Sequence, residues 1–149
     1  MKSVFNDDDR RTLLARLSDL KADSPRQWGK MNASQMLRHC SLVLEMATGD
    51  RPEKQRLMGK IIAPFVRSSA LGEKPFGRSS PTDPTCVVTD ERDLQVEKAR
   101  LLELLNRLVT NGKESAGRYT HSFFGKLSGD EWGTLTHKHL DHHLRQFSV

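Results

Sequence analysis

The sequence predicts an all-α fold, a four-helix bundle with one long crossover connection. Four segments repeat apolar residues at helical spacing and carry capping signals at their ends. Strand-like alternation of apolar and polar residues is scarce, and residues 71–92 hold several prolines and glycines without a helical period. Long helices with one apolar face each bury that face against one another, which is the arrangement of a bundle.

The first two helices are predicted from their capping residues. The first is expected over residues 7–20, because Asn6 can cap it and three aspartates follow in the first turn, where the helix dipole favours negative charge. The second is expected over residues 32–49, because Asn32 and Gln35 have capping-box spacing and a glycine closes the segment.

The middle of the chain is less regular. Residues 54–70 are expected to form a shorter basic helix that is interrupted near Pro64, since proline lacks the N–H that a helix interior needs. Residues 71–92 are expected to be a long connection, with a short extended piece at residues 86–88. A connection of this length is uncommon unless it covers a site.

Two more long helices are expected in the C-terminal half. One should run over residues 93–109, with Gly112 as its stop. The other opens with Ser128 and Glu131 at capping-box spacing and should continue to about Phe147.

The composition suits a single domain over residues 1–149. Hydrophobic residues make up 36% of the chain and charged residues 29%, which is typical of folded globular proteins. No apolar run is long enough to span a bilayer, and the N-terminus lacks the apolar core of a signal peptide. Cys40 and Cys86 show no pairing pattern, so we expect a reduced, cytoplasmic protein.

The formal net charge of +5 raises the question of nucleic-acid binding. The basic residues are dispersed, and their one modest cluster lacks the interleaved aromatic residues that stack on bases. This cluster consists of Arg51, Lys54, Arg56, Lys60 and Arg67. We expect it to be a solvated helix face, and we expect neither nucleic acid nor a membrane as a partner.

Histidines are the most informative residues of the chain, because four of the six fall within residues 137–143. His139 and His143 are four residues apart and therefore lie on one face of the last helix, with His142 beside them. Two imidazoles one turn apart can bind one metal ion, as in other helical metal sites. Solvent-exposed histidines that bind nothing are the alternative, and the spacing alone does not decide between the two.

A third ligand must come from another element. His39 is the natural choice, because it lies at a core-facing position of the second helix. His121 lies in a loop, where its position is less constrained, and we expect it to contact substrate rather than the metal. Cys40 follows His39 directly and points about 100° away from it, so we expect an inert buried thiol.

Several segments together resemble the DinB-like superfamily. Residues 28–40 resemble the start of its second helix, and residues 139–146 resemble its final-helix motif of two histidines four residues apart. Residues 121–133, 72–76 and 81–84 resemble an uncharacterised bacterial branch, a domain of unknown function.

The resemblance implies an up-down-down-up four-helix bundle with a long crossover, and it allows a homodimer. It also implies a divalent metal, zinc or nickel, held by three histidines that match His39, His139 and His143. Characterised members of the superfamily are thiol-dependent transferases and an isomerase.

We therefore expect a metal-dependent enzyme that acts on an unknown small molecule, such as an S-transferase that uses a low-molecular-weight thiol, with His121 as its catalytic residue. The alternatives are a metal-dependent hydrolase and a helical bundle that binds a metal or small ligand without turnover.

Overall fold

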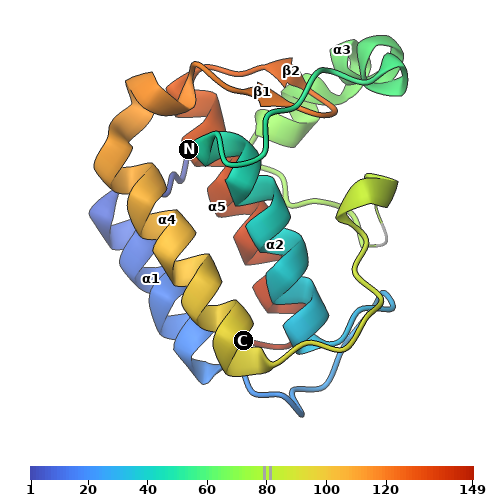
Figure 1. Ribbon diagram of the computed structural model, residues 1–149, viewed down its shortest axis with the longest axis vertical. Coiled ribbons are helices and arrows are strands. Elements are labelled where there is room, and N and C mark those ends of the chain that lie inside the picture. The colour runs from blue at the N-terminus through green and yellow to red at the C-terminus, as the bar shows by residue number, and fades with distance from the viewer. Residues whose placement is uncertain (79, 81) are drawn as a thin grey trace.

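The computed structural model describes residues 1–78, 80 and 82–149, and the protein is mainly helical. Pro81, part of one segment that carries the resemblance above, lies outside the described residues. Four long helices lie side by side in Figure 1: α1 (Asp7–Asp19), α2 (Ala33–Thr48), α4 (Leu94–Ala116) and α5 (Gly129–Gln146). Helix α3 (Leu57–Leu71) lies outside this group, close to a hairpin of two short strands, β1 (Thr120–His121) and β2 (Gly125–Lys126).

The predicted capping residues define the ends of the two helices that matter most for the site. Asn32 and Gln35 form a capping box at the start of α2, and Gly49 ends that helix in the left-handed conformation, with φ of 84°. Ser128 and Glu131 form the second capping box at the start of α5. These predictions are confirmed: the caps fix where each helix begins or ends, and its buried residues define the face that points inward.

Three predictions about the middle of the chain need correction. Helix α3 continues through Pro64, which is exposed, so water can satisfy the carbonyl that loses its donor. Residues 84–86 form a 3₁₀ turn, because Asp83 caps the Thr85 amide, so Cys86 is not part of the predicted extended piece; Val87 after the turn is extended. Helix α4 passes beyond Gly112, but that glycine has non-helical torsions (φ 79°, ψ 173°), so the predicted stop is a break within a longer helix.

The core lies between the four long helices. Its largest fully buried side chains include Trp132 of α5, Met36 and Leu37 of α2, and Leu101 and Leu108 of α4. No helix in the described part of the chain is long and apolar enough to span a membrane. Helices α2 and α5 contact each other, and polar side chains enter the core between them.

Candidate metal centre

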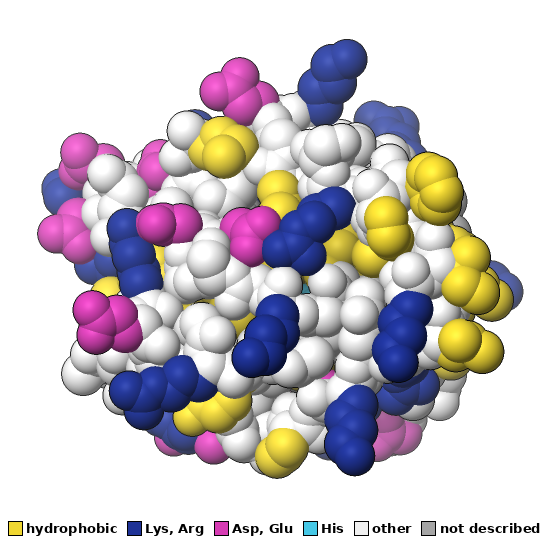
Figure 2. Space-filling view, turned by 90° about the horizontal axis from the view of Figure 1, so that it is seen from above, with side chains coloured by type: hydrophobic (Ala, Val, Ile, Leu, Met, Phe, Trp, Pro, Cys, Tyr) yellow, Lys and Arg dark blue, Asp and Glu magenta, His cyan; other side chains and the backbone are white. Residues whose placement is uncertain are grey.

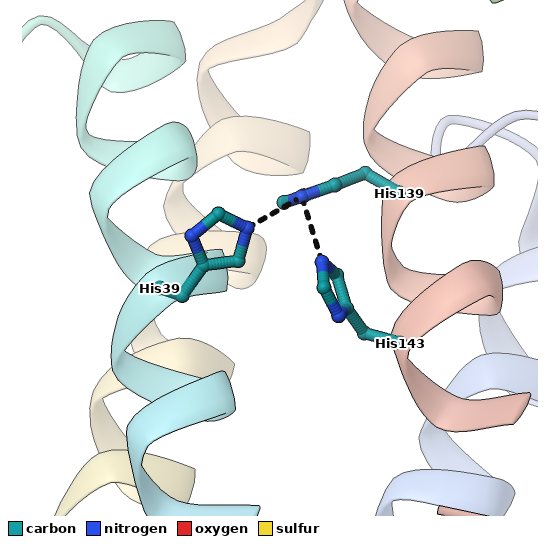
Figure 3. Close-up of side chains that lie close together, drawn as sticks. All are labelled: His39, His139 and His143. Atoms are coloured by element: carbon teal, nitrogen blue, oxygen red, sulfur yellow. Dashed lines mark hydrogen bonds between the residues drawn. The ribbon is translucent and has the colours of Figure 1, made fainter. Parts of the chain in front are cut away.

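Three histidine rings meet between α2 and α5 (Figure 3). His39 comes from α2, whereas His139 and His143 come from successive turns of α5. The Nε2 atom of His139 lies 2.9 Å from Nε2 of His39 and 3.1 Å from Nε2 of His143. The structure thus brings together the three residues that the sequence singled out, as a group that could hold a metal ion.

Hydrogen bonds to the opposite ring nitrogens fix the tautomers of two of these rings. His39 Nδ1 lies 2.7 Å from the carbonyl oxygen of Cys86, which can only accept, so Nδ1 carries the proton. His143 Nδ1 lies 2.8 Å from Oε1 of Gln146, whose amide nitrogen donates to the Trp28 carbonyl. Both rings therefore present an unprotonated Nε2 to the centre of the group.

This proton count leaves the group unsatisfied without a cation. One hydrogen on His139 Nε2 can be donated to His39 or to His143, and the Nε2 lone pair of the other ring is then left without a donor in this group. A metal ion accepts all three lone pairs at once. Two nitrogens, each about 2.0–2.1 Å from one tetrahedral ion, lie roughly 3.3 Å apart, which is close to the spacing of the rings. The donor set therefore fits a divalent cation.

Burial keeps these rings in the form that binds metal. Desolvation, together with the nearby His39 ring, lowers the pKa of His143 to about 3. Desolvation also lowers the pKa of His39 and places the pKa of His139 well below its usual value. All three imidazoles are neutral at pH 7, as ligation requires.

Two other histidines of α5 lie outside the group. The ring of His142 packs against Trp28 and Phe76, with ring centroids 5.4 and 5.8 Å apart. His137 lies on another side of α5 and lines a separate cavity of about 410 Å³ together with Asp141. Asp141 forms an ion pair with Arg16 at 2.6 Å.

His121 lies on β1, outside the three-histidine group. Its Nδ1 accepts hydrogen bonds from the backbone amides of Phe123 at 3.0 Å and Phe124 at 3.3 Å. The neutral ring must therefore carry its proton on Nε2, which makes that atom a donor rather than a ligand. Desolvation lowers the pKa of His121 to about 4, and a charge on this ring would lower the pKa of His139.

The face of α5 that carries His139 and His143 also carries two buried polar groups of interest. Trp132 Nε1 and Thr136 Oγ1 are buried and have no hydrogen-bond partner among the residues that the structure describes. At spacings of seven and three residues, both share a helix face with His139. Burying a donor without an acceptor costs free energy, so a bound molecule that accepts hydrogen bonds from these two groups would explain their burial.

Sequence reasoning missed the groups that orient the ligands. The acceptor for His39 is the backbone carbonyl of Cys86, and every residue type has such a carbonyl, so the sequence does not indicate it. Gln146 follows His143 by three residues and thus shares its helix face, a spacing that could have identified it. Its own anchor, the Trp28 carbonyl, comes from a distant segment.

Comparison with protein families gives one match. A family described as "Protein of unknown function (DUF1569)" matches residues 4–149, and the chain belongs to this family. The match bears out the predicted domain of unknown function. Comparisons with curated proteins and with solved structures gave no match.

Proposed function

We propose that this member of the DUF1569 family is a metal-dependent enzyme, with one divalent cation, zinc or nickel, held by His39, His139 and His143. The observation that carries the proposal is the meeting of three neutral imidazoles through Nε2, two of them oriented by acceptors behind them. Such oriented ligands are typical of protein metal sites, where the partners behind the ligands fix the tautomer.

The wider assignment is part of the same proposal. The packing of α5 against α1, α2 and α4 supports a four-helix bundle of the DinB-like type, in up-down-down-up order with a long crossover. We assign the chain to one such domain over residues 1–149, acting in the cytoplasm on a small molecule.

The chemistry follows from the ligand set. Three neutral ligands leave an open position on a tetrahedral ion, and a cation there lowers the pKa of a bound water or thiol towards neutrality. The buried ligand rings exclude water from one side of this position. His121, protonated at Nε2, is placed in the proposal to donate a hydrogen bond to the substrate.

The reaction proposed is transfer of a low-molecular-weight thiol to an electrophile. The unpartnered donors Trp132 Nε1 and Thr136 Oγ1 favour turnover over simple metal storage, since a substrate that accepts hydrogen bonds would satisfy them. The test is metal analysis of the purified protein, followed by a panel of electrophiles with and without thiols. Thiol consumption that requires metal supports the transferase. Metal-dependent consumption without thiol favours a hydrolase, and inactivity with bound metal favours a binding protein.

A substitution at Gln146 tests the proposed orientation of His143. Gln146→Leu removes the acceptor of the His143 Nδ1 proton, so zinc affinity is expected to fall about 10- to 100-fold. Gln146→Glu keeps an acceptor for Nδ1 but loses the donor to the Trp28 carbonyl, so its affinity is expected to lie between those of Gln146→Leu and the wild type. Competition with a chromophoric chelator measures both. Equal affinities for Gln146→Leu and the wild type would show that this hydrogen bond does not support the site.

A substitution at His121 separates substrate contact from metal ligation. His121→Ala is expected to keep zinc affinity within about threefold of the wild type, because Nε2 is held as a donor, but to lose metal-dependent turnover. His121→Asn, which can still accept from the Phe123 amide, controls for the hairpin. If His121→Ala and His121→Asn both empty the site, His121 is a ligand and the assigned role is wrong.

A further inference from the structure

Helix α3 exposes its large side chains and buries its small ones. Gly59, Ala63 and Ala70 face the protein, and a Cβ on Gly59 would collide with the backbone of Phe123. Phe65 is 83% exposed. The other exposed apolar residues of the helix are Leu57, Met58, Ile61, Ile62 and Val66. A helix that packs on the core of its own protein normally buries its large apolar side chains, and α3 does the opposite. A contiguous exposed apolar surface of this kind is typical of a binding face.

The charged residues within the segment of this helix are basic, although Glu53 and Glu73 flank it. The sequence from Lys54 to Gly72 holds four basic residues and no acidic residue. Arg56 and Arg67 form ion pairs with neighbouring acids, whereas the exposed Lys54 and Lys60 have no ion-pair partner within the described part of the chain. Figure 2 shows Lys and Arg side chains beside the hydrophobic ones on this part of the surface.

The lysines Lys54 and Lys60 help to decide which partner could cover this face. A second copy of the chain, related by a two-fold axis, would bring Lys54 and Lys60 of both copies to one interface, and like charges brought together are unfavourable. Nucleic acid would match the charge but would leave Phe65, Ile61 and Leu57 without a partner. An anionic lipid surface matches both features, because apolar side chains enter the acyl boundary and lysines remain at the headgroups.

We infer that the exposed face of α3 docks the protein, without spanning, onto the surface of a bilayer that contains anionic phospholipid. This inference departs from the expectation of a solvated helix face without a membrane partner, because the helix also exposes large apolar side chains, such as Phe65 and Ile61. The inference does not depend on the metal centre, which lies between α2 and α5.

Vesicle sedimentation of the full chain tests this inference. The wild type is expected to pellet with vesicles of phosphatidylcholine and phosphatidylglycerol, and at least about tenfold less with phosphatidylcholine alone. The double variant Ile61→Ser/Phe65→Ser and the double variant Lys54→Glu/Lys60→Glu are each expected to bind at least about tenfold more weakly. Matched controls are Val96→Ser on α4, where the side chain is 64% exposed, and Lys21→Glu. Both should bind like the wild type.

A second measurement separates docking from misfolding and from self-association. A Phe65→Trp variant should shift its fluorescence to the blue on addition of anionic vesicles, as an inserted indole does. Absence of wild-type binding, or equal loss in the Val96→Ser control, would overturn the inference. So would a dimer in solution that Ile61→Ser/Phe65→Ser dissociates while the wild type ignores vesicles, since the occupant would then be a second copy.

Discussion

Replacing His139 by alanine is expected to abolish stoichiometric metal binding. The Nε2 atoms of His39 and His143 lie 2.9 and 3.1 Å from His139 Nε2. Without His139, only these two nitrogens remain as ligands, which is too few for tight binding. The expected loss of zinc affinity is at least about 100-fold, more than removal of an orienting hydrogen bond causes. Metal content after dialysis and chelator competition measure the effect.

His142→Ala is the matched control for this experiment. His142 belongs to the same helix and lies next to His143, but its ring packs against Trp28 and Phe76. This variant should hold as much zinc as the wild type. If His142→Ala empties the site and His139→Ala does not, the ligand assignment is wrong.

Acid is expected to destabilise the metal-free protein steeply between pH 6.5 and about 4. Burial lowers the pKa of every histidine in the folded chain, to about 4 for His121 and about 3 for His143. Below pH 6.5 the unfolded chain therefore binds protons that the folded chain does not, and stability falls with falling pH. Each well-buried ring contributes up to about 1.4 kcal/mol per pH unit, so several rings approach a domain's whole stability of about 5–15 kcal/mol.

Urea unfolding of metal-free protein at pH 7.5, 6.5, 5.5 and 4.5 checks this expectation. The free energy of unfolding should be nearly constant between pH 7.5 and 6.5 and then fall more steeply with each step. His143→Gln removes one of the titrating groups. It should reduce the dependence of the unfolding free energy on pH by the contribution of one ring. Constant stability from pH 7.5 to 4.5 would contradict the buried, neutral state of the histidines.

The sequence predicts the site well where local geometry decides it. The capping boxes at Asn32 and Ser128 mark the helix starts, and the apolar periodicity of each helix places His39 and the His139–His143 pair on inward faces. Given two helices that pack against each other, these three rings have few other places to go. The same local signals predict the bounds of α1, α2 and α5 to within a few residues.

Features that depend on distant contacts escape sequence reasoning. The Cys86 carbonyl reaches His39 from the long connection, and no side chain signals it. The tautomer of His121 depends on a hairpin of two-residue strands that lacks an alternating pattern. Helix α3 shows the correct period, but the sequence cannot reveal that its small face, around Gly59, is the one that packs inward.

The central claim is tested most directly by anomalous diffraction from crystals of the wild-type protein grown with zinc, measured on both sides of the zinc absorption edge. The account predicts one anomalous peak between α2 and α5, about 2.0–2.1 Å from Nε2 of His39, His139 and His143. Crystals in which zinc binds elsewhere on the chain, with no peak between these three rings, would contradict it.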